Sequence, residues 1–372
     1  MDKVNIIRDN STLKKFCNKC IKEKVLAIDT EFIRENTYFP VLCLVQIASE
    51  SFSAVIDPLS EIDMKPVWDI LSNEKILKVF HAGRQDLEIF FNLFGFLPHN
   101  IFDTQIAFSF LCQEYQISYE KLVFKLLKIK LDKTFQYYDW SLRPISKDQL
   151  IYALNDVYYL RKIYFKIEKK LRSKNRLHWA IEESKTYLNK KLYINNPENY
   201  WKNIFTSKTK DLNLFNLKKI CEWREKKCTS LNISRKLVFS DKDIIILIKK
   251  PNSLNSLSIK YKLDKKDLTI IDKILSNNSE NLLKEKTKIS KNNVELLNIL
   301  KIILKLISNE LNISQNLIAT TSDLEKLNFK NNKKSKLFKN WRNEVFGIKI
   351  KQFLNNELKI ITKKNNFFLE KN

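Results

Sequence analysis

The 372-residue sequence predicts an α/β domain, with a mixed sheet flanked by helices, followed by two all-α helical domains. Two observations support this prediction. Short apolar runs alternate with helical segments in the first third, whereas segments with strand character nearly vanish after residue 104. Apolar residues make up 44% of the chain, which is enough for a sizeable core and argues against intrinsic disorder.

Four runs in the first third have the length and composition of strands: Val25–Asp29, Leu42–Ser49, Phe52–Asp57 and Ile76–His81. Only two residues separate the second run from the third, which indicates an antiparallel hairpin. Helices are expected at 63–72, 84–93, 104–112, 118–128, 147–173 and 176–190. A break at Asn195-Asn196-Pro197 is followed only by helical segments. We therefore expect domains at 1–200, 201–290 and 291–372.

Several classes of protein are excluded by composition. No run of 18 apolar residues occurs, and the first 15 residues lack the apolar segment of a secretory signal. Six cysteines are too few for a disulfide scaffold in a chain of this length and fit a reducing compartment. Cys17-x-x-Cys20 lacks a second pair, so helix packing is preferred to a zinc or redox site. We expect a cytoplasmic protein without a membrane partner.

The net charge of +25 is unevenly distributed. Residues 1–150 carry 19 Lys and Arg against 20 Asp and Glu, whereas residues 151–372 carry 48 against 22. Nucleic acid is the partner that this excess favours, because Lys and Arg neutralise phosphates and release counterions. The alternative is a coding bias, since only 10 of the 67 basic residues are Arg. Such a bias does not by itself explain the asymmetry.

Two carboxylates, Asp29 and Glu31, follow the apolar run VLAI directly. Residues i and i+2 of a strand share a face, so the two side chains project side by side. Adjacent negative charges in a buried place are unfavourable without a cation, and Mg²⁺ prefers carboxylate oxygens. Taken alone, the pair also fits a solvated strand end.

Two further acidic residues occur in motifs on expected helices. Asp86 lies in HAGRQDLEIF, in the first turn of a helix after a strand, where the helix dipole alone favours an acidic residue. Tyr152 and Asp156 are four residues apart and share one face of a helix, among apolar residues. Tyrosine is common in such a core, but a buried aspartate needs a partner. A metal ion shared with Asp29 and Glu31 supplies one.

Together these motifs resemble the DEDD exonucleases, in the subgroup with a tyrosine. Over residues 1–190 the sequence looks like the ribonuclease D family, in AIDTEFIRENTYFPVLCLVQIA, VFHAGRQDLEIF, FDTQIAFSFL and DWSLRPISKDQLIYALNDVYYLRKIY. Residues 211–285 look like an HRDC domain, although Ser234 and Cys228 stand where that family often has proline and a small residue. Residues 291–365, with WRNEVFG, resemble a second HRDC-like domain.

The resemblance implies a ribonuclease H-like fold and two divalent metal ions, Mg²⁺ or Mn²⁺. It implies that Asp29 bridges both ions, that Glu31 and Asp156 complete the first site, and that Asp86 holds the second mostly through water. Two such ions stabilise the attacking and leaving oxygens of a phosphodiester hydrolysis. Tyr152 would orient the attacking water, because a phenol with a pKa near ~10 is a poor base at neutral pH.

Four other residues are expected near the substrate: Phe32, Gln46, His81 and Arg143. Phe32, Gln46 and the 34–40 loop line the path of the terminal nucleotides if the resemblance holds there, and plain packing is an equal alternative. For His81, a core or supporting role is preferred to that of a ligand. For Arg143, structural support is preferred, with a phosphate contact as the alternative.

The resemblance favours RNA as the partner, with tRNA precursors as the family's usual substrate, trimmed from the 3′ end to release 5′-mononucleotides. The basic helical domains would supply affinity for RNA. A DNA exonuclease of the same superfamily is an alternative. A non-catalytic RNA-binding module is another, but it predicts a lost carboxylate and all four are present. Trp223 and Trp341 could stack on bases, although buried positions are preferred. The oligomeric state is open, with a monomer favoured.

Overall fold

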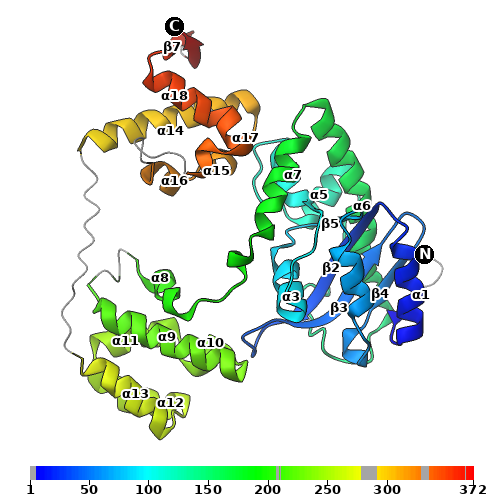
Figure 1. Cartoon of the computed structure of the whole chain (residues 1–372), viewed down its shortest axis with the longest axis vertical. Helices are drawn as coiled ribbons and strands as arrows, with labels where there is room; N and C mark the ends of the chain where they lie inside the picture. The colour runs from blue at the N-terminus through cyan, green and yellow to red at the C-terminus, as the bar shows by residue number, and fades with distance from the viewer. Residues whose placement is uncertain (1–5, 207–208, 210, 278–290, 328–334, 365) are drawn as a thin grey trace. The chain divides into compact units, whose positions relative to one another are not determined.

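The computed structural model describes residues 6–206, 209, 211–277, 291–327, 335–364 and 366–372, with only the backbone of residues 291–293 (Figure 1). The chain divides into two compact units. The first combines Met1–Glu31, Cys43–Leu192 and Lys288–Asn372, and the second combines Phe32–Leu42 with Tyr193–Thr287. The boundary expected near residue 290 adjoins residues 278–290, which lie outside the described residues.

A mixed six-stranded sheet is the centre of the first unit, in the order β1-β4-β3-β2-β5-β6. Its strands are β1 (Ile6–Ile7), β2 (Val25–Ile33), β3 (Val41–Ala48), β4 (Ser53–Ile56), β5 (Leu77–Phe80) and β6 (Ile101–Asp103). β3 and β4 pair antiparallel, whereas β1–β4, β2–β5 and β5–β6 pair parallel. The predicted mixed sheet and the hairpin are therefore confirmed.

The structure differs from the expected elements in three places. β2 continues to Ile33, so Asp29-Thr30-Glu31 lies inside a strand and not at its end. β1 and β6 were not predicted, because two or three residues carry no periodicity, and their pairing with β4 and β5 alone makes them strands. No bounds were predicted for the helix Asn10–Cys20, whose buried residues lie at helical spacing while its lysines are exposed.

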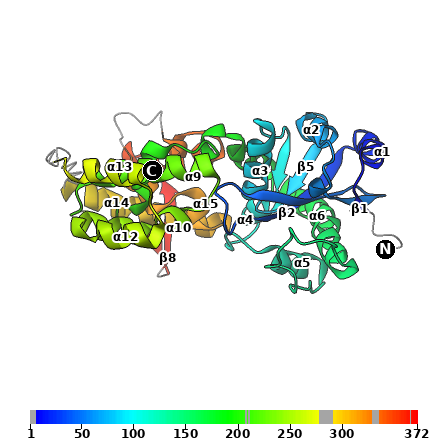
Figure 2. The same cartoon turned by 90° about the horizontal axis from the view of Figure 1, so that it is seen from below.

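Helices cover both faces of this sheet, with α1, α2 and α3 on one side and α5 and α6 on the other (Figure 2). They are α1 (Asn10–Cys20), α2 (Lys65–Ser72), α3 (Arg84–Phe94), α4 (Thr104–Ser109), α5 (Tyr119–Leu127), α6 (Lys147–Ser173) and α7 (Leu177–Lys185). Cys17 and Cys20 are buried in α1, and burial raises the pKa of Cys17 to about 12. None of the six cysteines forms a disulfide, in agreement with the preferred packing role.

A capping box and a buried apolar stripe fix the first half of α6 against the sheet. Ser146 begins it with a capping box, in which Ser146 Oγ accepts from the backbone N–H of Gln149 while Gln149 Oε1 accepts from the backbone N–H of Ser146 at 2.7 Å. An apolar stripe that includes Ala153, Val157 and Leu160 is fully buried or nearly so. This packing fixes the direction of the side chains between these positions.

The C-terminal region of the first unit is largely helical, as predicted. It contains α14 (Lys291–Leu311), α15 (Gln315–Ile318), α16 (Thr321–Glu325), α17 (Asn340–Arg342) and α18 (Ile348–Leu354). It ends, however, in an antiparallel hairpin, β7 (Leu358–Lys363) and β8 (Asn366–Lys371). The all-α prediction is thus corrected for 358–371. The alternation in LKIITK was obscured by its lysines, but Leu358 is buried and supports the strand.

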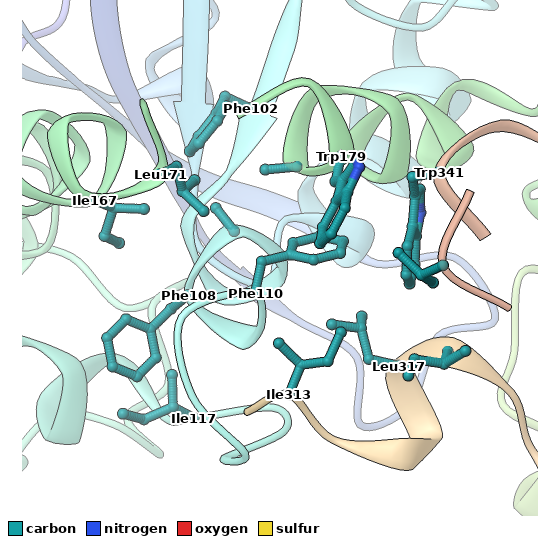
Figure 3. Close-up of a cluster of buried hydrophobic side chains, with 14 of the residues drawn as sticks. Phe102, Phe108, Phe110, Ile117, Ile167, Leu171, Trp179, Ile313, Leu317 and Trp341 are labelled. Carbon is teal, nitrogen blue, oxygen red and sulfur yellow. The ribbon is translucent and has the colours of Figure 1, made fainter. Parts of the chain in front are cut away.

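An aromatic core joins the C-terminal region to α7 (Figure 3). The ring centroid of Trp341 lies 4.9 Å from that of Phe110 and 5.8 Å from that of Trp179. Arg342 forms an ion pair with Glu183, in which Nη2 donates to Oε1 at 2.8 Å, and Trp341 Nε1 donates to the same carboxylate at 2.9 Å. Trp341 is therefore a core residue, which was the preferred interpretation.

The second unit is a helical bundle to which the segment after β2 is attached. Its helices are α8 (Trp201–Ile204), α9 (Leu214–Leu231), α10 (Arg235–Val238), α11 (Asp241–Lys249), α12 (Leu254–Tyr261) and α13 (Lys265–Leu275). Trp223 is buried in its core. Tyr38 is also buried there, and its hydroxyl donates to Glu225 at 2.7 Å. Among the described residues, no helix has the length and apolar character needed to cross a membrane.

Candidate active site

Carboxylates from three elements meet in the first unit: Asp29 and Glu31 from β2, Asp86 from the first turn of α3, and Asp156 from α6. The negative charges of Asp86, Asp156 and Glu31 each raise the pKa of Asp29. Such mutual effects require short separations in a poorly solvated place. The four residues predicted to act together are therefore brought together.

A pocket of about 200 Å³ opens at this place, lined among others by Asp29, Tyr152 and Asp156. A second hollow of about 170 Å³ also borders Tyr152 and Asp156. These three side chains keep part of their surface accessible from the pocket. Their surroundings are nevertheless dense enough to desolvate their charged forms.

Burial is the main cause of the carboxylate pKa shifts. It raises the pKa of Asp29 and Glu31 well above their usual range, with neighbouring carboxylates as the next cause. It also raises the pKa of Asp86 to about 6 and that of Asp156 to about 7. Without a cation at this place, these carboxyls therefore keep their protons to a higher pH than ordinary carboxyls do.

The position of Asp86 depends on a tight junction between β5 and α3. Gly83 is the N-cap of α3, and a Cβ at this position would meet Phe80 Cβ at 2.6 Å, so only glycine fits. The N–H of Gly83 donates to Asp103 Oδ2 at 2.8 Å, which fastens the junction to β6. Asp86 itself accepts a short hydrogen bond from the hydroxyl of Thr30. The contact of Thr30 with Asp86 was not predicted, because the sequence analysis considered only the two acidic residues on either side of Thr30.

Tyr152 lies one turn before Asp156 on α6 and packs against Phe135 and Trp140, with ring centroids 5.9 Å and 6.0 Å away. Burial, followed by the charges of Asp156 and Glu31, raises the pKa of its hydroxyl. The phenol is therefore protonated at neutral pH and can donate a hydrogen bond into the pocket.

His81 borders the pocket but has both ring nitrogens engaged. Nε2 lies 3.1 Å from the carbonyl of Ile117, and Nδ1 lies 3.0 Å from the hydroxyl of Thr104. Burial lowers the pKa of His81 to about 4, so the ring is neutral, with Nε2 donating to the carbonyl. These contacts support the preferred supporting role.

A second tyrosine at the pocket, Tyr119, was not singled out in the sequence. Its hydroxyl donates to the backbone carbonyls of Asn155, at 3.2 Å, and Asp156. Its ring lies 5.4 Å from that of His81. Tyr119 thus holds the turn of α6 that carries Asp156. A tyrosine at the start of an amphipathic helix gives no signal beyond core packing, so sequence reasoning had nothing to detect.

Arg143 and Gln46 are not among the residues that line the two pockets. Arg143 is bound within the fold: Nη2 donates to Asp57 at 2.6 Å and Nε at 2.9 Å, while Nη1 donates to the carbonyl of Trp140 at 2.7 Å. Gln46 is fully buried in β3, and neither amide atom has a partner among the described residues. Phe32 follows Glu31 in β2 and is half-buried.

The donor set fits a hard divalent cation, because four carboxylates repel one another here and a cation would remove that repulsion. In the described part of the chain, no three His, Cys, Asp or Glu side chains are yet arranged to hold a metal ion. Asp86 instead binds Thr30.

Comparisons with known proteins agree with this geometry. Residues 4–172 match the family model described as 3′–5′ exonuclease. Ribonuclease D of Bartonella henselae is 38% identical over 90% of this chain and 86% of its own length. The chain belongs to the ribonuclease D family. Ribonuclease D of Nitrobacter hamburgensis is 34% identical over 92% of this chain and 93% of its own.

A crystal structure gives the same result. RNase D of Escherichia coli, described as an exoribonuclease involved in structured RNA processing, superposes with a TM-score of 0.80 at 26% identity. The match covers 95% of this chain and 99% of that one. Membership of the ribonuclease D family makes the chain a 3′–5′ exoribonuclease, a hydrolase, and confirms the predicted enzyme class.

Proposed function

We propose that the chain trims the 3′ ends of structured RNA, such as tRNA precursors, and releases 5′-mononucleotides. The observation that carries this proposal is the meeting of Asp29, Glu31, Asp86 and Asp156 with Tyr152 around one pocket. The similarity to the Escherichia coli enzyme, described as acting in structured RNA processing, supports the substrate class.

The four carboxylates are proposed to hold two divalent ions, Mg²⁺ or Mn²⁺. Asp29 would contact both, Glu31 and Asp156 would complete the first site, and Asp86 would hold the second, mostly through water. When bound, the ions would lower the pKa of a water and stabilise charge on the reacting phosphate. The raised pKa values support this assignment, because carboxylates destabilised by their neighbours gain most from a cation.

Tyr152 is proposed to orient the attacking water. Its hydroxyl is protonated at neutral pH, so it cannot serve as the base and acts by hydrogen bonding. The rings of Phe135 and Trp140 restrict its motion. Two further residues support the site through the backbone. Tyr119 donates to the backbone carbonyl of Asp156, and His81 contacts the backbone carbonyl of Ile117 just before α5. Contacts of Phe32, Gln46 and the 34–40 loop with terminal nucleotides stay predictions.

The domain arrangement is proposed as an exonuclease domain at 1–200, an HRDC domain at 201–290 and a second HRDC-like domain at 291–372. The helices α9 to α13 fall within the proposed HRDC domain, and α14 to α18 within the second. The basic charge of residues 151–372 supports RNA binding by this part of the chain. The cytoplasmic location stays a prediction.

The test is digestion of a 3′-extended tRNA precursor with Mg²⁺ or Mn²⁺, with the products sized. We expect stepwise shortening from the 3′ end and release of 5′-mononucleotides. The Asp29→Asn variant should release none, whereas Asp272→Asn, at an exposed position of α13, should act as the wild type. Matched RNA and DNA oligonucleotides separate the alternatives, and faster digestion of DNA would overturn the proposed substrate.

A further inference from the structure

The second half of α6 is the most basic segment of the exonuclease part of the first unit. Residues 161–173 of this helix contain six Lys and Arg and a single acidic residue, Glu168. The first half of the same helix carries the site residues Tyr152 and Asp156. The positive charge of the chain therefore begins within the exonuclease fold itself, and not only in the helical regions that follow.

A hollow of about 510 Å³ lies where this half of α6 meets α5, which packs beside it (Figure 2). Its lining includes Lys166, Lys169, Lys170 and Ser173 from α6, with Lys125 from α5. All five side chains are exposed. We call Lys166, Lys169 and Lys170 the lysine cluster. Lys169 and Lys170 follow Lys166 by three and four residues, a spacing that places side chains about 5–6 Å apart, so the ammonium groups can meet more than one phosphate.

The three lysines of the cluster form no ion pairs with other described residues. In the described part of the chain, no ion pair involves any of its three members, whereas Lys125 is paired with Glu114 at 2.6 Å. Glu168, the nearest acidic residue in the sequence, is paired with Arg172 at 2.7 Å. Lys166 Nζ donates only to the carbonyl of Leu126, at 3.2 Å. Three exposed positive charges thus border one hollow without neutralisation.

The lysine cluster is within reach of an RNA held at the pocket. Ten residues of helix separate Asp156 from Lys166 and fourteen separate it from Lys170, which corresponds to about 15 Å and about 21 Å along α6. Because α6 is one continuous helix, these distances are fixed. A strand with stacked bases rises about 3.4 Å per nucleotide and covers these distances with about five or six nucleotides.

We propose that the lysine cluster is a binding site for the phosphate backbone of the RNA substrate, several nucleotides from the end being cleaved. The site reads charge and not sequence, since lysine ammonium groups contact phosphates without base recognition. The inference deepens the proposed function and rests on it. It also alters the sequence-based expectation that only the helical domains supply affinity for RNA.

The test compares two triple variants of the full chain that lose the same charge. One changes the cluster, Lys166→Ala, Lys169→Ala and Lys170→Ala. The matched control is Lys14→Ala, Lys15→Ala and Lys19→Ala, three exposed lysines of α1. Binding is measured in EDTA with a hairpin RNA that carries a 3′ tail. Turnover is measured with Mg²⁺ on the same RNA and on a three-nucleotide RNA, which spans only about 10 Å.

We expect the cluster variant to bind the tailed hairpin at least tenfold more weakly, and the slope of log affinity against log salt to fall by about 2–3. The control should stay within about twofold of the wild type, and cleavage of the three-nucleotide RNA should be unchanged in both variants. Equal affinities of the two variants would overturn the proposal.

The same experiment distinguishes failure of the proposed function from failure of the lysine-cluster proposal. If the wild type released no mononucleotide from either RNA, the proposed function would be wrong whatever the binding result. If the wild type cleaved both RNAs and the cluster variant bound the hairpin normally, only the lysine cluster would be refuted.

Discussion

Replacing Asp156 by asparagine should stabilise the metal-free protein while it abolishes activity. Burial raises the pKa of Asp156 from 3.8 to about 7 in the folded protein. Among the described residues, its carboxylate forms no side-chain hydrogen bond or ion pair, and its backbone carbonyl accepts from Tyr119. The substitution therefore removes the charge and leaves the rest of the contacts in place.

The sign of the effect follows from the two pKa values. Between about pH 4 and pH 7, the unfolded chain has released a proton that the folded protein keeps, so the fold loses stability as the pH rises through this window. The difference of about three pH units corresponds to a loss on the order of 4 kcal/mol, complete above pH 7. The asparagine variant has no such loss. Its stability relative to the wild type should rise by about this amount between pH 4 and pH 8.

The assay is hydrogen–deuterium exchange of the α6 amides in EDTA, corrected for intrinsic exchange rates, because a chain of two units does not unfold in one step. Asp272→Asn is the control and should show no such pH-dependent gain. Mononucleotide release should fall by at least about a hundredfold in Asp156→Asn. A variant that is equally destabilised at both pH values, or that retains activity, would refute the reasoning.

Three further predictions follow from the contacts. Tyr152→Phe should slow mononucleotide release at least tenfold in single-turnover assays and leave the Kd for RNA within about twofold, and a parallel loss of both would indicate a structural tyrosine. Arg143→Lys should lower the free energy of unfolding by about 1–3 kcal/mol in urea denaturation, because the buried Asp57 loses its two hydrogen bonds from the guanidinium. The salt dependence of RNA binding should be unchanged in this variant. Arg342→Ala should make the C-terminal region more sensitive to limited proteolysis, since Glu183 loses its ion pair and keeps only the hydrogen bond from Trp341, and protection equal to the wild type would argue against that anchor.

The site could be predicted from the sequence because each carboxylate lies in a local pattern that fixes its direction. Asp29 and Glu31 alternate on a strand, and Asp156 follows Tyr152 by one helical turn. Residue spacing alone does not bring three separate elements together, and the family resemblance supplied that step. The supporting contacts of Thr30 and Tyr119 depend on tertiary packing and left no trace in the sequence.

The errors in the fold have a similar origin. β1 and β6 are strands only because neighbouring strands pair with them, so their short sequences carry no period of their own. The hairpin β7–β8 was hidden by lysines on its exposed face. The attachment of the segment around Tyr38 to Glu225 joins residues far apart in the sequence, which no local pattern predicts.

The central claim is that four carboxylates form one site for divalent cations. Crystals of the full chain soaked with Mn²⁺, with anomalous scattering measured at the manganese edge, test it most directly. The account predicts two manganese peaks bound by Asp29, Glu31, Asp86 and Asp156, and their loss in Asp29→Asn crystals. Manganese bound elsewhere, or no manganese at these residues in a crystal of active enzyme, would contradict it.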